Sequence, residues 1–535
     1  MYKLFLCWRY LLTRYIALAS VVSVMLGVAT MIVVNAVMLG FTSEMKDRIH
    51  GILADVIFQT YDRNKGFPDY EWHRTEILRV AGDLIDELTP VAVTPGMLLY
   101  RVNGSSESAS FQVDIVGIDV LTHGKVSKIA EYLQHPENRN NLSFTLREDG
   151  YDIQGSGKNG AIREQMEYAG WGYRRYRAAQ TRFQEQLEAR QARQNAAVPP
   201  LQNGAGNNVS NDAGNDGENE IPIDLFAALS LPGMKAFDPA TEQHTGIIIG
   251  IGTSLYRRTE EIDPATGKQV VKDDLMLIPG DDVTLAFPTA DYPIRFQSDS
   301  FTVTELYESK MADYDRKLVF VPIKELQRLR GMVDADSGTP TVTQILIKAK
   351  PGVNIVKLRD RLQAVFPPQV FAVTTWQDEQ KELLNAIFTE LAMLNVLLFL
   401  IFAVAGFGIL AIFYMIVVEK QKDIGILKAL GAGSGGIMLI FLYYSLLLGI
   451  VGAGLGLGLG LLMVKYIREV AMVLSYILRR DVFSPEVYSF YEIPAIVDVW
   501  TVFFIIAGAL LIAVSAGILP AIRAARVHPV ETLRS

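Results

Sequence analysis

Residues 391–418 read LAMLNVLLFLIFAVAGFGILAIFYMIVV, a stretch without a single charged side chain. Three further stretches share this property, at residues 15–41, 431–464 and 500–522. A helix needs roughly 20 apolar residues to cross about 30 Å of hydrocarbon, and all four stretches exceed that length. The sequence therefore predicts an integral membrane protein with four membrane-spanning helices.

The first stretch has the basic leader of a signal peptide. However, it is longer than the apolar region of such a peptide, and Gly40-Phe41-Thr42 is not a small-x-small cleavage site. We expect an uncleaved first span.

Basic residues on the loops between spans indicate their orientation, because cytoplasmic loops carry an excess of Lys and Arg. Three groups fall on one side of a four-span protein: Lys3, Arg9 and Arg14; Lys420, Lys422 and Lys428; and Arg523, Arg526 and Arg534. Lys465, Arg468, Arg479 and Arg480, between the third and fourth spans, oppose this assignment. We predict that both termini are cytoplasmic and that residues 42–390 form a large extracytoplasmic domain.

Several classes of function have little support in the sequence. The net charge of −8 argues against nucleic acid as a partner, and the single cysteine, Cys7, excludes an intrachain disulfide. Gly155-Ser-Gly-Lys158 resembles a phosphate loop, but Asp152 and Asn159 replace its required glycine and Ser/Thr. The spans lack the ionisable residues that ion-driven transporters use. We predict no catalytic residue, no metal ligand and no cofactor-binding residue.

Small and polar residues within the spans predict helix contacts. Gly452, Gly456 and Gly460 recur every four residues, a spacing that lets two helix backbones approach closely. For Asn35 and Asn395 we favour an inter-helix hydrogen bond over contact with a substrate.

The pattern of residues 42–390 predicts an α+β domain. Strands are expected at residues 55–60, 111–118, 246–250, 282–287, 301–306, 317–321 and 342–347, and helices at 71–88, 323–329 and 354–366. Residues 160–195 predict a polar, Arg-rich helix, for which a solvated face is favoured over binding of a partner or of lipid headgroups. Residues 201–220 have almost no apolar side chain, so we expect disorder there.

The loop between the second and third spans is the most informative segment. It resembles the E-K-x-x-[ED]-I-[AG]-I-L-[KR]-x-L-G-A signature of the FtsX-like ABC permease family. The matching residues are Glu419, Lys420, Asp423, Ile424, Ile426, Leu427, Lys428, Leu430, Gly431 and Ala432. Its pattern predicts a short amphipathic helix with Ile424, Leu427 and Leu430 on one face, ended by Gly431. In the family it resembles, this segment is the coupling helix that contacts the ATPase; a mere lid on the bundle is the alternative.

Residues 3–41 and 519–534 are similar to the lipoprotein-releasing branch of this family, and three stretches of the extracytoplasmic domain agree with it. The resemblance covers about 400 residues, all but an insertion at about 125–243. It implies a MacB-like periplasmic core at 42–390 and an FtsX-like permease domain at 391–535. Within the latter it places spans at 391–418, 433–464 and 500–522 and the coupling helix at 419–431.

The resemblance further implies an inner-membrane permease that transmits motion and is not an enzyme itself. ATP and Mg²⁺ would be bound by a separate ABC ATPase subunit. Other implied partners are a second permease copy or paralogue, a lipoprotein substrate, a periplasmic lipoprotein carrier and membrane lipids. Two alternatives stay open: a MacB-like efflux permease, and an FtsX-type signalling protein that regulates a cell-wall hydrolase.

Overall fold

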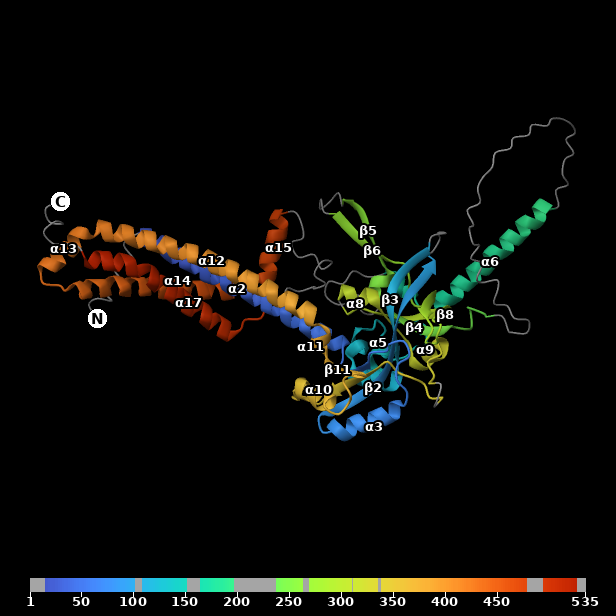
Figure 1. Cartoon of the computed structure of the whole chain (residues 1–535). Coiled ribbons are helices and arrows are strands. Elements are labelled where there is room, and N and C mark those ends of the chain that lie inside the picture. The colour runs from blue at the N-terminus through green and yellow to red at the C-terminus, as the bar shows by residue number, and fades with distance from the viewer. Residues whose placement is uncertain are drawn as a thin grey trace, which may run out of the picture.

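The computed structural model describes residues 15–101, 108–151, 164–196, 237–262, 269–309, 311–334, 338–478 and 494–526. The predicted disordered stretch at 201–220 and Cys7 lie outside these residues. The described chain forms an elongated helical bundle and a sheet domain, residues 53–380, at one end of it (Figure 1).

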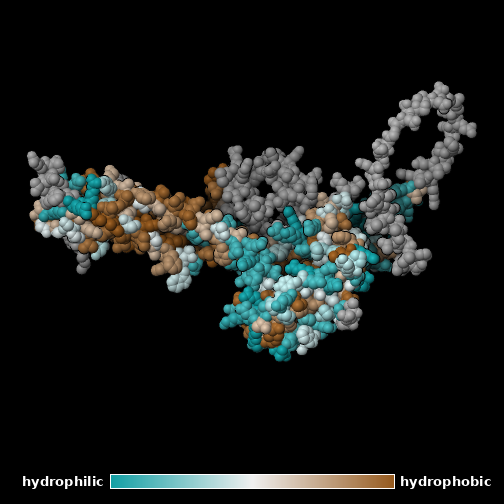
Figure 2. All heavy atoms as spheres, viewed as in Figure 1, coloured by the Kyte–Doolittle hydropathy of each residue, from teal (hydrophilic) through white to brown (hydrophobic). Residues whose placement is uncertain are grey.

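Four helices of the described part are long and apolar enough to cross a membrane, as the charge-free stretches predict. They are α2 (Tyr15–Ile52), α12 (Lys381–Glu419), α14 (Ser434–Lys465) and α17 (Val499–Ala525). The middle of the bundle is largely brown, hence hydrophobic, on the face shown in Figure 2. With 38 and 39 residues, α2 and α12 are each roughly 55–60 Å long, so they extend well beyond the hydrocarbon of a bilayer. We call their charged extensions, residues 42–52 and 381–390, the stalk.

Helix α14 packs against both α2 and α17. Gly452, Gly456 and Gly460 face α2 so closely that an added Cβ would come within 2.7, 2.8 and 3.1 Å of its atoms. An added Cβ at Gly454 or Gly458 would meet nothing within 4 Å. These three glycines, spaced four residues apart, therefore form the surface on which the backbones of α14 and α2 meet; we call them the glycine row.

The inter-helix hydrogen bond expected of Asn35 is not what the structure shows. Its Nδ2 donates to Met31 O, one turn earlier on the same helix, at 3.0 Å. A polar side chain on a helix can satisfy itself on its own backbone carbonyls, and the sequence does not reveal which partner it takes.

The sheet domain is built on nine strands in the order β11-β1-β10-β2-β3-β9-β4-β8-β7. Only β3–β9 and β4–β8 are parallel among the pairings of this sheet. In sequence order the strands are β1 (Val56–Thr60), β2 (Ile85–Arg101), β3 (Ser108–Ile118), β4 (Thr245–Gly250), β7 (Asp282–Pro288), β8 (Phe296–Tyr307), β9 (Leu318–Pro322), β10 (Gln344–Ala349) and β11 (Phe371–Thr375). A separate hairpin joins β5 (Leu255–Ile262) and β6 (Gln269–Leu275).

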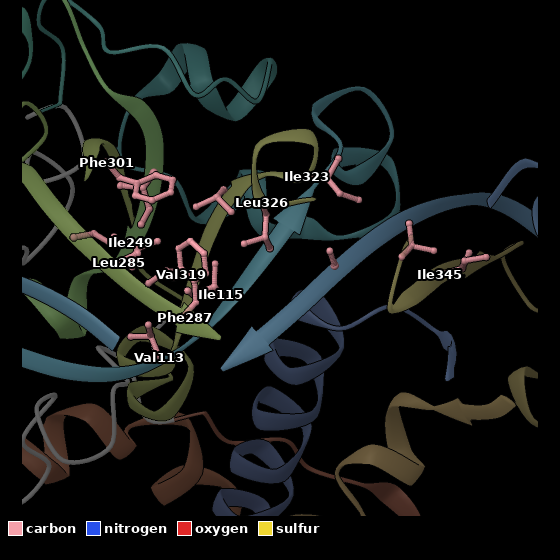
Figure 3. Packing of buried hydrophobic residues seen from close by; sticks show 14 of the residues in the cluster. Val113, Ile115, Ile249, Leu285, Phe287, Phe301, Val319, Ile323, Leu326 and Ile345 are labelled. Carbon is pink, nitrogen blue, oxygen red and sulfur yellow. The ribbon is translucent and has the colours of Figure 1, made fainter. Parts of the chain in front are cut away.

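The long strand β2 closes part of this sheet into a ring. Its residues 91–101 pair with β3, and Met97, Leu98 and Leu99 also pair with β7 at the other end of the strand order. Six strands therefore enclose a core, as in a small barrel. Figure 3 shows side chains of this core from β3, β4, β7, β8, β9 and α9 (Ile323–Arg330), among them Val113, Ile249, Leu285, Phe301 and Leu326.

The helices of the sheet domain lie around these strands. They are α3 (Tyr70–Ala81), α4 (Val120–Val126), α5 (Pro136–Asn140), α6 (Trp171–Ala196), α7 (Ile251–Ser254), α8 (Ala312–Lys317), α9, α10 (Ile355–Gln363) and α11 (Trp376–Glu379), with 3-10 turns at Lys128–Tyr132 and Glu164–Tyr168. The helix predicted at 71–88 is wrong beyond Ala81. Gly82 caps α3, and Ile85 and Leu88 belong to β2, where pairing with β10 outweighs the helical spacing of their side chains.

Helix α6 corresponds to the Arg-rich segment predicted at 160–195. It is not solvated throughout: the buried Arg174 bonds Asp282 Oδ1 at 2.7 Å and Gly280 O at 2.9 Å. Beyond Arg182 the described side chains of α6 are exposed, and the helix projects from the sheet domain (Figure 1). The sequence did not reveal this division into an anchored and a free half.

The glycine row offers a matched test of the α2–α14 contact. Gly456→Leu forces a side chain against Met25 O and Val28, and overpacking of this kind costs about 1–3 kcal/mol. We expect the melting temperature of the detergent-purified protein to fall by several degrees. Gly454→Leu, two residues away with open space around it, should leave the melting temperature unchanged; equal effects of the two variants would contradict the packing.

Candidate functional site

Helix α13 (Gln421–Ala429) joins α12 to α14 at the end of the bundle that lies away from the sheet domain (Figure 1). A glycine terminates it two residues after its last helical residue, in agreement with the prediction. Gly431 has φ +96°, and the N–H groups of Gly431 and Ala432 donate to Lys428 O and Leu427 O, both at 3.0 Å. This left-handed cap satisfies the last carbonyls of the helix and turns the chain towards α14.

The structure divides the predicted apolar face of α13. Ile424 is buried, 3% exposed, in the same hydrophobic cluster as Val417 and Ala521. Ile424 is thus part of the helix bundle, which corrects the prediction that it shares one partner-facing surface with Leu427 and Leu430. The bundle fills the space on that side of α13, a tertiary contact that helical periodicity does not reveal.

Three apolar side chains of this segment remain exposed. Ile426, Leu427 and Leu430 are 48%, 36% and 80% exposed, and we call them the α13 patch. Glu419, at the end of α12, and Ala432, in the turn after α13, lie on either side of it in the sequence. Exposed large apolar side chains grouped at the polar end of a membrane bundle are typical of a binding surface.

Polar contacts fix α13 on the bundle. Lys420 pairs with Asp423 along the helix, and Lys428 Nζ donates to Ala525 O, near the end of α17, at 2.6 Å. The guanidinium of Arg523 lies 4.4 Å from the ring centre of Tyr414. Lys428 was predicted as part of the coupling-helix signature, and the structure shows that it also connects α13 to α17. A force applied to α13 therefore reaches two spans directly.

A second set of contacts joins the stalk to the sheet domain, and sequence reasoning missed it. The His50 ring stacks on Trp376, with centroids 5.3 Å apart, and His50 Nε2 contacts Asp55 Oδ1. Ser127 Oγ donates to Ile52 O at 3.0 Å. The only sequence signal was indirect: the last carbonyls of α2 need partners wherever that helix ends.

Asp55 is the central polar group of this junction. Its other oxygen, Oδ2, accepts from Ala349 N at 2.8 Å, and its backbone oxygen accepts from Trp376 N at 3.3 Å. Burial raises the pKa of this carboxyl, but the hydrogen bonds from His50 and Ala349 outweigh it, so the pKa lies below its usual value. Asp55 thereby connects the end of α2 to β10 and α11.

The start of α12 is fixed at the same place. Thr375 and Asp378 form a capping box around α11, and Ile49, Trp376 and Leu384 form a buried apolar cluster between α2, α11 and α12. In the stalk, Lys46 Nζ lies 5.1 Å from the ring centre of Phe388. Both stalk helices are thus attached to the sheet domain at one point, which we call the junction.

Among the described residues, no three His, Cys, Asp or Glu side chains are grouped so as to hold a metal ion. Two other features stand out in the described part of the chain: the α13 patch at one end of the bundle and the junction at the other.

The junction provides a test with a matched control. Trp376→Ala removes a large, 7% exposed side chain shared by α2, α11 and α12, and such truncations cost about 3–5 kcal/mol. We expect a lower melting temperature and faster proteolysis between α2 and β1. Trp72→Ala, on α3 with 60% exposure, should stay within about 0.5 kcal/mol of the parent. Similar losses in both variants would show that Trp376 has no special role.

Comparison with known proteins agrees with the resemblance noted in the sequence. Residues 395–529 match the family described as FtsX-like permease C-terminal. The lipoprotein-releasing system transmembrane protein LolC of Xylella fastidiosa is 28% identical over 234 residues, 44% of this chain and 55% of the relative. LolC of Neisseria meningitidis is 26% identical over 288 residues, 54% and 64% of the two chains.

LolE of Haemophilus influenzae is 27% identical over 168 residues, 31% of this chain and 40% of the relative. The matches to the two LolC proteins thus span between about half and two thirds of each relative. The relatives named here thus include both LolC and LolE proteins. Residues 395–529, which include most of α12 and all of α13, α14 and α17, thus match an FtsX-like permease domain, and the chain is similar to LolC and LolE over part of their length.

Proposed function

We propose that this chain is the membrane subunit of an ABC transporter that works by mechanotransmission, and that it releases lipoproteins from the inner membrane. The observation that supports this most is the continuity of α2 and α12 from the membrane bundle to the junction. Movement at one end of such a helix is delivered to the other end without a path for substrate through the bundle.

The α13 patch is the proposed contact with an ABC ATPase subunit. Leu427 and Leu430 are exposed in the chain alone, and Lys420 and Lys422 lie beside them in the sequence. A short amphipathic helix of this kind fits an apolar groove on a soluble partner. In this proposal the ATPase binds ATP and Mg²⁺, both termini lie in the cytoplasm, and the sheet domain is the periplasmic core.

The proposed cargo rests on the relatives and on the character of the spans. The matching LolC and LolE proteins are named for a lipoprotein-releasing system. The charge-free stretches of α2 and α12, residues 15–41 and 391–418, suit a cargo whose acyl chains leave the bilayer sideways, because acyl chains need an apolar surface. In this proposal a second permease copy or paralogue forms the other side of the lateral exit from the bilayer, and a periplasmic carrier receives the lipoprotein.

Release by the assembled transporter tests the cargo. The chain, its ATPase and its permease partner would be reconstituted in vesicles with an acylated lipoprotein. We expect ATP-dependent transfer of this lipoprotein to a soluble acceptor. A version of the same protein that is anchored by a transmembrane helix should stay in the membrane. Equal transfer of both, or ATP hydrolysis without transfer of either, would refute lipoprotein release.

Substitution of two members of the α13 patch, Leu427 and Leu430, tests its role in binding the ATPase. Leu427→Asp and Leu430→Asp place a carboxylate in the proposed apolar contact, at a cost of several kcal/mol of association, about 10²-fold or more in affinity. Because both positions are exposed, the chain itself should still fold. We expect loss of ATPase co-purification and of lipoprotein release.

Two controls separate docking from folding. Lys422→Ala removes an exposed charge, worth about 0–1 kcal/mol, and should keep the ATPase bound. Ile424→Asp buries a carboxylate in the bundle and should reduce the yield of folded permease. Normal ATPase binding by Leu427→Asp and Leu430→Asp would show that α13 is not the docking helix.

A further inference from the structure

Helix α15 (Ile467–Leu478) follows α14 after a single residue, Tyr466. One spanning helix, α14, lies between α13 and α15 in the sequence, so α13 and α15 lie at opposite ends of the bundle. The sheet domain lies on the side of α15, because it connects α2 to α12. In Figure 1, α15 runs across the direction of α14 at this end of the bundle.

An apolar stripe on α15 is exposed. Val470, Val473, Leu474 and Ile477 follow the spacing of one helix face and are 38%, 59%, 40% and 68% exposed. Arg468 lies on the opposite side of the helix by its position in the turn. The helix is therefore amphipathic, with its apolar side uncovered.

Aromatic residues place the start of α15 at the membrane boundary. Tyr466 is 45% exposed at the end of α14, and Trp500 is 71% exposed in the first turn of α17. Tyr and Trp are enriched where hydrocarbon meets headgroups. Lys465 Nζ lies 5.5 Å from the centre of the Tyr466 ring, and Asp498 caps α17 beside Trp500. Charged groups thus begin at the level at which α15 turns away from α14.

We propose that α15 lies in the plane of the membrane on the side of the sheet domain, with Val470, Val473, Leu474 and Ile477 among the lipid acyl chains. The last turns of α14 also expose apolar side chains, Leu461 and Leu462, just before α15 begins. In this arrangement Arg468 and Lys465 would lie near the phosphate groups of the lipids. A second copy of the chain is a poorer occupant. Four aliphatic side chains offer only a few hundred Å², against about 800 Å² per partner in a stable interface.

This role goes beyond ATPase docking and cargo release, and it depends only on α14 and α17 spanning the membrane. Because α14 meets α2 along the glycine row, an α15 held in the interface fixes the depth of α14 while α2 transmits movement.

Spin labels on the full chain, in vesicles of phosphatidylethanolamine and phosphatidylglycerol, test the proposal. A Cys7→Ser background removes the single native cysteine. Val473→Cys and Ile477→Cys place labels on the stripe, and Arg468→Cys places one on the other side. We expect the stripe labels to collide several-fold more with oxygen than with a water-soluble nickel chelate, at a depth of about 5–10 Å below the phosphates. The label at 468 should show the reverse preference.

Two outcomes would overturn the proposal. Strong collision with the nickel chelate at 473 and 477 would place the stripe in water. Low collision with both reagents, together with spectra broadened by a neighbouring label, would show that a second copy covers it. The measurement needs neither ATP nor lipoprotein, so its failure is distinguishable from failure of the proposed function.

Discussion

The need to carry an unbroken hydrogen-bond ladder out of the bilayer governs this structure. In hydrocarbon an unpaired backbone group costs several kcal/mol, so a spanning segment stays helical until water, headgroups or other protein groups can take up its last backbone groups. Helices α2 and α12 continue past that boundary as the stalk and end only where other groups receive them. Ser127 Oγ donates a hydrogen bond to Ile52 O, and the Asp55 carboxylate accepts from His50 Nε2 and Ala349 N. At the junction, polar groups of the sheet domain bond to the chain where the two long helices end.

The same constraint explains the division of labour among the spans. Helices α2 and α12 reach the sheet domain, whereas α14 and α17 begin or end near Tyr466 and Asp498. The short helices meet the long ones through small residues: Gly452, Gly456 and Gly460 bring α14 to α2. Van der Waals contact between close backbones holds helices together in lipid, where the hydrophobic effect gives no preference.

Much of this could be predicted from the sequence, because membrane insertion leaves a strong local signal. The charge-free stretches gave four spans, and the segment around Gly431 gave the turn between α12 and α14. Local patterns failed where a tertiary contact decides. Ile85 and Leu88 fit a helical spacing but pair in β2, and Ile424 fits a partner-facing stripe but is buried by the bundle. No pattern in the sequence links His50 and Asp55 with Trp376, so only the fold identifies the junction.

The position of Ile424 changes how force enters the bundle. Had Ile424 faced a partner together with Leu427 and Leu430, α13 could rotate on a loose connection and absorb movement. Instead Ile424 is buried in the same hydrophobic cluster as Val417 of α12 and Ala521 of α17, and Lys428 Nζ donates to Ala525 O. A helix attached on one side and exposed at Leu430 on the other cannot move without moving its neighbours, because packed interiors deform little. Helix α12 ends at Glu419, directly before α13, and begins at Lys381, beside the junction. In the mechanism that we propose, displacement of the α13 patch would therefore be carried along one helix to Trp376.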